Sequence, residues 1–256
     1  MPMRIAIAGK GGTGKTTIAA LLCRSLVKTN GVKPLLAVDA DPNSCLHERL
    51  GITPSETIGE LREQLRAEPD KIPAGISKTE WIERLISEEV AESVGFDLIT
   101  MGRQEGPDCY CYINNLLRSC LDKIGQHYKA VVIDNEAGLE HLSRRSNGKV
   151  EALLVVCQPT VIGARTAMRI LELIDSLSLD IGKAYLVLNG CDGEIPESLQ
   201  ALFDETKLEV LARIPTDQQV FDCEMESKSL LDLTAESTAA ATVDAMVSKL
   251  LEEAKQ

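Results

Sequence analysis

The chain has 256 residues, a formal net charge of −12 and 44% hydrophobic residues, an ordinary balance for a globular α/β protein. The negative charge argues against nucleic acid and anionic membranes as partners, because both carry charge of the same sign. No apolar run reaches the roughly 18 residues that a membrane-spanning helix needs, so we expect a cytoplasmic protein. In such a reducing compartment, the eight cysteines are expected to be free thiols or metal ligands and not disulfides.

Short apolar runs alternate with segments of helical periodicity along the whole chain. The predicted strands are Arg4–Ala8, Pro34–Val38, Leu98–Met101, Ala130–Ile133, Ala152–Val156, Ala184–Leu188 and Val210–Ile214. The predicted helices are Thr16–Lys28, Ile113–Gly125, Ala164–Leu177 and Ser237–Ala254, with a pair of surface helices within Thr57–Glu92. This alternation predicts an α/β fold with a doubly wound, mostly parallel sheet flanked by helices, built as a single domain over residues 1–256.

A phosphate-binding loop follows the first predicted strand and opens the first predicted helix. The loop comprises Gly9, Lys10, Gly11, Gly12, Thr13, Gly14, Lys15 and Thr16, which match the pattern G-x-x-x-x-G-K-[ST] in full. Its glycines allow backbone N–H groups to turn toward phosphate oxygens at the start of a helix. We expect Lys15 to neutralise the β- and γ-phosphates and the Thr16 hydroxyl to ligate Mg²⁺, with Thr17 also binding nucleotide. The motif predicts an ATPase that binds ATP and ADP with Mg²⁺.

Carboxylates follow two of the predicted strands. Asp39 and Asp41 come directly after Pro34–Val38, and Asp134 directly after Ala130–Ile133. Any one of them could be an ordinary turn or helix-cap residue. Because the carboxyl ends of parallel strands meet at the ligand-binding edge of a sheet, three such residues predict a shared magnesium site. Asp134 is the expected magnesium carboxylate, acting directly or through water.

A pair of cysteines stands apart from the nucleotide motif. Cys109 and Cys111 are two residues apart, a spacing that directs both sulfurs to one side of an extended segment or into one turn. Soft thiolates of this kind favour Ni, Zn, Cu(I) or Fe–S iron. Two ligands do not complete a site, but a two-fold symmetric dimer would supply four. The other interpretation is a pair of partly buried free thiols.

The sequence K-G-G-T-G-K-T-T resembles the deviant Walker A motif of the MinD/ParA/nitrogenase-iron-protein superfamily. The resemblance implies that Lys10 reaches across a homodimer to the partner's nucleotide, so that Lys10, Lys15 and Asp41 form the catalytic set. It also implies that Asp39 lies near the water shell of Mg²⁺ and that Asp41 orients or activates the water that attacks the γ-phosphate. Finally, it implies that Asn189 contacts adenine and that the turn at Pro215 packs against the base.

A narrower resemblance involves the cysteines. The segment Gly106–Tyr112, together with Asp134–Arg145, resembles the CooC-type maturation ATPases of carbon monoxide dehydrogenase and acetyl-CoA synthase. It implies that Cys109 and Cys111 of two subunits hold Ni²⁺ or Zn²⁺ at a dimer-bridging four-thiolate site. The implied partner is apo carbon monoxide dehydrogenase or acetyl-CoA synthase, which receives nickel. The same resemblance makes His141, Arg144 and Arg145 switch residues that couple the nucleotide state to the metal; the other interpretation of these three is a solvated, charged helix start. Gly138 is expected to bend a switch that senses the γ-phosphate.

Two alternatives remain open at this stage. An Fe–S reductase-like ATPase would take a second cysteine from the segment after Asp134, where residues 134–149 contain none. A partitioning or positioning ATPase of the ParA/MinD kind would need a DNA-binding patch or a basic amphipathic tail. The tail Ser237–Gln256 carries Asp244, Glu252 and Glu253 against Lys249 and Lys255, so it is not basic. Both alternatives share the phosphate loop with the maturation hypothesis and differ from it in the function of the dimer.

Overall fold

The computed structural model describes residues 2–54, 56–68, 72–103, 123–136, 149–177 and 179–254. These residues form an eight-stranded sheet with the order β3-β4-β2-β5-β1-β6-β7-β8, parallel throughout except between β3 and β4. The strands are β1 (Met3–Gly9), β2 (Leu35–Ala40), β3 (Ala91–Glu92), β4 (Phe96–Thr100), β5 (Ala130–Asn135), β6 (Val150–Cys157), β7 (Ile181–Asn189) and β8 (Glu209–Ile214). The predicted doubly wound, mostly parallel sheet is confirmed, and β3 is the strand that the sequence did not predict.

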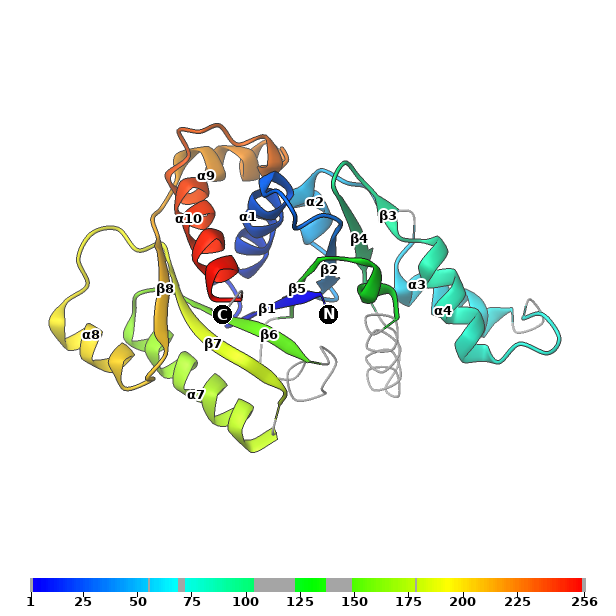
Figure 1. Cartoon of the computed structure of the whole chain (residues 1–256), viewed down its shortest axis with the longest axis horizontal. Coiled ribbons are helices and arrows are strands. Elements are labelled where there is room, and N and C mark those ends of the chain that lie inside the picture. Colours follow the sequence, from blue (N-terminus) through cyan, green and yellow to red (C-terminus); the bar gives the residue numbers. More distant parts are fainter. Residues whose placement is uncertain are drawn as a thin grey trace.

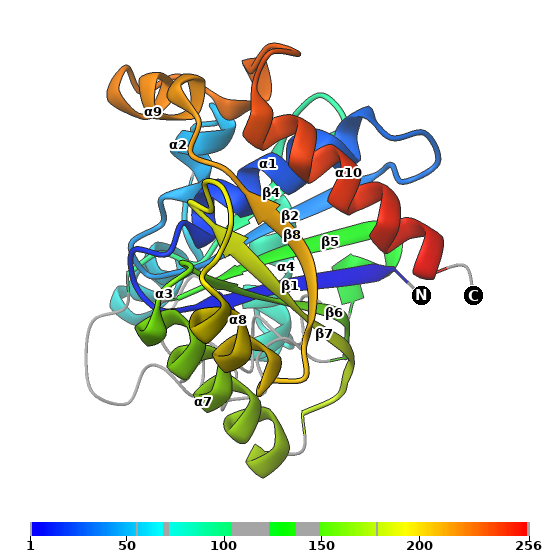
Figure 2. The same cartoon turned by 90° about the vertical axis from the view of Figure 1, so that its left-hand side faces the viewer.

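Helices cover both faces of this sheet (Figures 1 and 2). They are α1 (Lys15–Lys28), α2 (Leu46–Leu50), α3 (Ile58–Ala67), α4 (Lys78–Glu88), α7 (Val161–Leu177), α8 (Glu197–Asp204), α9 (Gln218–Met225) and α10 (Thr238–Glu253), with 3-10 turns η2 (Gly125–His127) and η3 (Leu230–Asp232). One hydrophobic core joins α1, α2 and α10 to the sheet, and a second core lies beneath α3, α4, α7 and α8. The helix pair expected within Thr57–Glu92 is present as α3 and α4. The helix expected over Ile113–Gly125 lies largely outside the described residues.

The central strands are apolar on both sides because helices lie on both sides. All six residues of β5 and all six of β2 are buried, and their side chains alternate between the two cores. The central strands β2, β5, β1, β6 and β7 are all paired in parallel. The loops at the carboxyl ends of β1, β2, β5, β6, β7 and β8 therefore gather at one edge of the sheet.

The last described helix, α10, belongs to the core. Its apolar face, which includes Val243, Met246 and Leu250, is buried in the core that α1 shares. Arg24 of α1 donates to Leu233 O at 3.0 Å and pairs with Asp244 of α10 at 3.4 Å, which ties the two helices together. Across the described part of the chain, none of the helices combines the length and the apolar character that a bilayer-crossing segment requires.

Truncating the core between α1 and the sheet tests this packing. Leu22 is completely buried, so Leu22→Ala is expected to lower the free energy of unfolding by about 3 kcal/mol, through lost burial and a residual cavity. Urea denaturation measures this change. Val94→Ala, at a side chain that is 90% exposed, is the matched control and should change stability by less than about 0.5 kcal/mol. Equal effects at the two positions would contradict the packing described.

Candidate functional site

The phosphate loop joins the end of β1 to the start of α1, and its glycines are required by close neighbours. Gly14 has φ of 88°, and a Cβ added there would lie 2.2 Å from Nδ2 of Asn189. Gly12 has φ of 77°, also in the left-handed region. A Cβ at Gly9 would lie 2.3 Å from the carbonyl oxygen of Val156 on β6. The loop therefore folds only with small residues where the motif places them.

The N-terminus of α1 lacks the side-chain cap that α3, α4, α9 and α10 have. Its N-cap residue is Gly14, which has no side chain, and its first turn holds no acidic residue. By contrast, α3 and α4 begin with capping boxes, and Asp217 and Ser237 cap α9 and α10. The first N–H groups of α1 and its positive dipole end are thus left for an anion.

Lys15 lies in the first turn of α1 with its side chain turned back over the loop. It is 7% exposed, and its Nζ donates to the carbonyl oxygen of Lys10 at 3.4 Å. Burial lowers the pKa of Lys15, while the carboxylates of Asp134, Asp41 and Glu136 counteract part of that effect. The side chain of Lys10 is exposed. The two lysines therefore face different environments, one inside the loop and one in solvent.

Asp39 and Asp134 are brought together by strand register, as the sequence predicted. They are Cα partners across the parallel pair β2 and β5, and they are 0% and 1% exposed. Asp39 accepts hydrogen bonds from the backbone N–H groups of Leu46 at 2.9 Å and Asp41 at 3.2 Å. Among the described residues neither buried oxygen of Asp134 has a hydrogen bond of ordinary geometry, although the Thr16 hydroxyl lies near enough to lower the Asp134 pKa.

Burial dominates the ionisation of both carboxyl groups. Burial and the neighbouring Asp134 raise the pKa of Asp39 to about 8, and the two backbone hydrogen bonds offset only part of this. Burial raises the pKa of Asp134 to about 6, while Thr16 and Lys15 act in the opposite direction. Two buried carboxylates beside a threonine hydroxyl are oxygen donors that suit Mg²⁺. The orphaned oxygens of Asp134 therefore fit a bound cation.

Asp41 begins a tight turn beyond the end of β2. Its Oδ1 accepts from the backbone N–H of Asn43 at 2.8 Å and from Nδ2 of Asn43 at 2.9 Å. Its carbonyl oxygen accepts from the N–H of Ser44 at 2.9 Å. Among the described residues both of these side-chain hydrogen bonds go to Oδ1, which leaves Oδ2 of Asp41 available to a ligand or water.

Asn189 ends β7 and holds the loop from the other side. Its Nδ2 donates to the carbonyl oxygen of Thr13 at 2.9 Å, a contact that the sequence did not predict. Pro215 follows β8, and the next residue, Thr216, is bound through its N–H and hydroxyl to Asp192 at 2.9 and 2.7 Å. The predicted residues Asn189 and Pro215 thus come from neighbouring strand ends, β7 and β8, and stand beside the phosphate loop.

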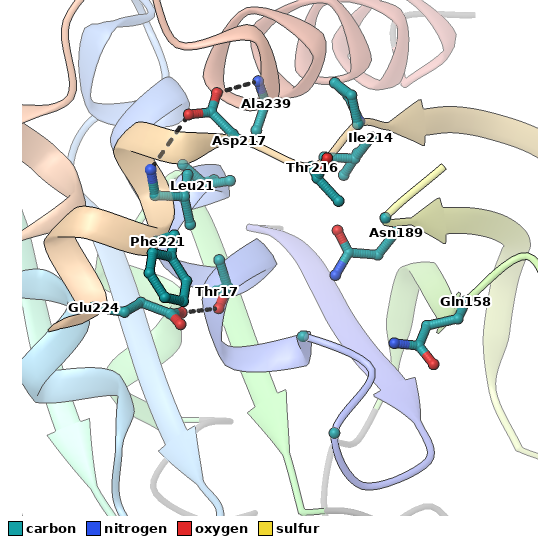
Figure 3. Close-up of a pocket in the computed structure, with 15 residues that line it drawn as sticks. Thr17, Leu21, Gln158, Asn189, Ile214, Thr216, Asp217, Phe221, Glu224 and Ala239 are labelled. Atoms are coloured by element: carbon teal, nitrogen blue, oxygen red, sulfur yellow. Dashed lines mark hydrogen bonds between the residues drawn. The ribbon is translucent and has the colours of Figure 1, made fainter. Parts of the chain in front are cut away.

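A cavity of about 470 Å³ opens between these parts, within the range of small-molecule sites (Figure 3). Thr17 and Glu224 lie on one wall, Asn189 on the opposite wall, and Ile214 and Thr216 above them. Gly12, Gly14 and Pro215 also line it, so the cavity runs from the phosphate loop to the predicted base-contacting turn.

Sequence reasoning missed the contributions of α9. Asp217, two residues after the predicted turn at Pro215, accepts hydrogen bonds at the starts of both α9 and α10. Burial opposes its ionisation, but the N–H of Ala239, the Ser237 hydroxyl and the first N–H groups of α9 outweigh it and lower the pKa of Asp217. Phe221 and Glu224 complete the cavity wall. An acidic N-cap before Gln218 is a local signal that could have indicated α9.

The metal-binding prediction cannot be followed to a geometry. Cys109, Cys111, Gly138, His141, Arg144 and Arg145 lie outside the described residues. In the part of the chain that the structure does describe, no three or more His, Cys, Asp or Glu side chains gather as a soft-metal cluster would. The thiolate site stays a prediction.

The sheet order, the glycine loop and the uncapped helix define a phosphate-loop nucleotide-binding protein. The chain matches the family described as CbiA, the CobQ/CobB/MinD/ParA nucleotide binding domain, over residues 5–230, and it belongs to that family. This confirms the superfamily that the loop sequence indicated.

Several known proteins are similar to the chain. An uncharacterized ATP-binding protein of Methanocaldococcus jannaschii is 37% identical over 252 residues, which cover 97% of this chain and 98% of that protein. The carbon monoxide dehydrogenase accessory protein CooC of Rhodospirillum rubrum is 28% identical to the chain. The alignment covers 91% of this chain and 90% of that protein. The cell division ATPase MinD of Pyrococcus furiosus has the same fold, with a TM-score of 0.72 and 23% identity. The superposition covers 99% of this chain and 100% of the MinD chain.

The buried acid pair predicts a pH-dependent stability. Asp39 and Asp134 have raised pKa values, so the folded protein keeps protons that the unfolded chain releases near pH 4. Without metal or nucleotide, their contribution to stability should therefore fall as the pH rises from about 4 to 8. Asp39→Asn removes one of the two titrating groups. The free energy of unfolding of wild type, relative to that of the variant, should therefore be larger at pH 5 than at pH 8.

Urea denaturation in EDTA at several pH values measures this difference. Asp222→Asn, on an exposed side chain of α9, provides the baseline for losing one surface carboxylate. A wild-type advantage that grows with rising pH would show that the pair is ionised in the folded state.

Proposed function

We propose that the chain is an ATP-hydrolysing maturation factor that dimerises with ATP and helps insert nickel into carbon monoxide dehydrogenase or acetyl-CoA synthase. The supporting observation is a phosphate-loop site in a chain that aligns over 91% of its length with a carbon monoxide dehydrogenase accessory protein. The pair Cys109 and Cys111 supplies the soft ligands such a role needs. We treat the chain as one working domain, residues 1–256.

The nucleotide would bind with its phosphates at the start of α1. The loop N–H groups between Gly9 and Thr16, and the Lys15 ammonium, would hold the β- and γ-phosphates, with Thr17 on the same end. Thr16 and Asp134 would hold Mg²⁺, with Asp39 acting through water, and that ion would neutralise charge developing on the transferred phosphoryl group.

Asp41 is the residue we assign to the attacking water. Its Oδ1 is fixed by Asn43, which leaves Oδ2 to accept a hydrogen bond from a water molecule over the loop. Nδ2 of Asn189 donates to the carbonyl oxygen of Thr13, so the Oδ1 of Asn189 would be the atom that accepts from the adenine amino group. Pro215 would pack on the base. These contacts favour ATP as the substrate and ADP as the product.

The homodimer would form over the edge of the sheet that carries the loop. Lys10 is exposed there and would reach a partner's nucleotide. Val161 and Ile162, at the start of α7 directly after β6, are 45% and 61% exposed, which is unusual for such large apolar side chains. Since β6 pairs with β1, this apolar patch lies next to the loop. A second copy of the chain would cover it.

The metal would be bound by four thiolates, Cys109 and Cys111 of each subunit, as cargo on its way to an apo enzyme. Thiolates at this spacing accept Ni²⁺ and Zn²⁺ alike, so the nickel assignment depends on similarity to CooC. In this proposal ATP closes the dimer around the metal, and hydrolysis accompanies its transfer.

The competing function is a ParA/MinD-like positioning ATPase. Relatives include a septum site-determining protein MinD of a Synechocystis species, 24% identical over 84% of this chain. The apolar face of α10 is buried against the core, so α10 itself is a core helix and not an exposed amphipathic segment. The similarity to CooC over 91% of the chain is what leads us to prefer the maturation role.

The two lysines of the loop should separate binding from catalysis. Lys10→Ala is expected to retain ADP affinity within a few-fold but to lose ATP-dependent dimerisation and at least about 100-fold in turnover, by analogy with charges supplied in trans. Lys15→Ala is expected to lose nucleotide binding itself. Calorimetric ADP titration, light scattering and phosphate release measure the three properties. Lys28→Ala, at the exposed end of α1, is the control, and a Lys10→Ala protein with normal turnover would contradict the role in trans.

The cysteine pair tests the maturation role. The double variant Cys109→Ser/Cys111→Ser should lose stoichiometric metal, expected at one ion per dimer, and should no longer support activation of the recipient enzyme. Its ATP-binding affinity should remain. Metal analysis with and without nucleotide, and activation of apo carbon monoxide dehydrogenase or apo acetyl-CoA synthase, provide the measurements. Cys23→Ala, at a buried core position, is the control. A double variant that keeps full metal content and still activates the recipient enzyme would contradict the maturation role and favour the positioning role.

A further inference from the structure

A second cavity lies between α3 and α4, and the functions assigned so far do not use it. Its volume is about 290 Å³, and its described lining residues are all different from those of the nucleotide cavity. The two helices stand at the β3 edge of the sheet, whereas β8 forms the opposite edge (Figure 1). The cavity is therefore a separate feature of the molecule, which we call the α3–α4 groove.

Apolar side chains form the inside of the α3–α4 groove. Leu61 and Leu65 of α3 are each 4% exposed, whereas Trp81 and Leu85 of α4 remain half-buried. Each pair is four residues apart, so its two side chains share one face of a helix. The volume lies at the lower limit of small-molecule sites, so it suits one or two large side chains better than a cofactor.

The rim of the groove is acidic. Glu56 accepts a hydrogen bond from Nε2 of Gln64 at 2.9 Å, and both residues line the groove. Glu89 lines it too and is the C-cap of α4, where the negative end of the helix dipole adds to its charge. From Glu56 to Glu92 the sequence has ten acidic and five basic residues. This part of the surface therefore attracts cationic partners and repels nucleic acid and anionic lipid.

Other charged contacts of α4 lie away from the groove or are balanced within the helix. Lys123 bonds to Glu83, which is two positions from Trp81 and therefore stands on the opposite face of α4. The guanidinium of Arg84 lies 5.5 Å from the centre of the Trp81 ring and is paired with Glu88 at 2.9 Å. Because Glu88 balances Arg84, the charge of Arg84 does not cancel that of the rim.

We propose that the α3–α4 groove docks a basic amphipathic helix of a partner protein. Large apolar side chains of that helix insert between Leu61 and Trp81, and its lysines or arginines lie over Glu56 and Glu89. An apolar groove with a charged rim is a recurrent way of binding such helices, in which the apolar anchors supply affinity and the charges select the partner. A second copy of this chain fits less well, because its net charge of −12 has the same sign as the rim.

Fluorescence of Trp81 tests the proposal, because Trp81 is the single tryptophan of the chain. The probe is a helical peptide of roughly 14 residues, with Leu at i, i+3, i+4 and i+7 spacing and Lys elsewhere. A second peptide has Glu in place of every Lys. Wild type should bind the Leu/Lys peptide at least about tenfold more tightly than the Leu/Glu peptide, with a blue shift of Trp81 emission. Added salt should weaken this binding.

The double variant Glu56→Lys/Glu89→Lys reverses the charge of the rim and should lower the ratio of the two affinities at least about tenfold. The matched control, Glu194→Lys/Glu205→Lys, makes the same change at two exposed carboxylates near α8 and should keep the ratio within about threefold. Thermal melting and Mg-ADP binding establish that each variant is folded.

The comparison of the two peptides on wild type tests the proposal even if the rim variant does not fold. An unchanged Trp81 emission with the Leu/Lys peptide, tighter binding of the Leu/Glu peptide, or equal changes in the two double variants would overturn it. A Trp81 shift that follows protein concentration without peptide would assign the groove to a second copy of the chain and would overturn it as well. Nucleotide binding is measured separately, so none of these outcomes decides the proposed function.

Discussion

The first turn of α1 is the constraint on which the site depends. Its backbone N–H groups have no side-chain cap, because the N-cap is Gly14 in a left-handed conformation. That conformation is in turn held by Asn189, whose amide fills the space where a Cβ would lie and binds the carbonyl oxygen of Thr13. A helix start of this kind is favourable only when an anion or water supplies the missing acceptors. The anion site is thus built from backbone, and the surrounding side chains adjust it.

The order of the strands places two carboxyl groups beside this helix start. Because β2 and β5 are parallel neighbours in register, Asp39 and Asp134 are forced together at one buried edge. Burial keeps both carboxyl groups from ionising easily, and Lys15 provides only part of the compensation. A buried pair of this kind costs stability unless a cation joins it. The arrangement makes chemical sense for a site that receives a magnesium-bound triphosphate.

The sequence predicted most of the sheet, because buried parallel strands appear as continuous apolar runs such as Ala130–Ile133. It did not predict β3, whose two residues are too short for any periodicity. Residues at strand ends were also predictable as a group, since the phosphate loop fixes which edge of the sheet binds ligand. The contacts of Glu224 were not, because Thr17 is 207 positions away and no local pattern reports such a pair. The same holds for Asn189, whose partner Thr13 is 176 positions away.

Hydrogen exchange measured by mass spectrometry, with and without Mg-ADP, tests the central claim most directly. If the uncapped start of α1 is the phosphate site, Mg-ADP should slow exchange of the amides from Gly9 to Thr17. It should also slow exchange near Asn189 and Pro215, which line the other end of the cavity. Unchanged exchange across Gly9–Thr17 at saturating Mg-ADP would contradict the account, whatever protection is seen elsewhere.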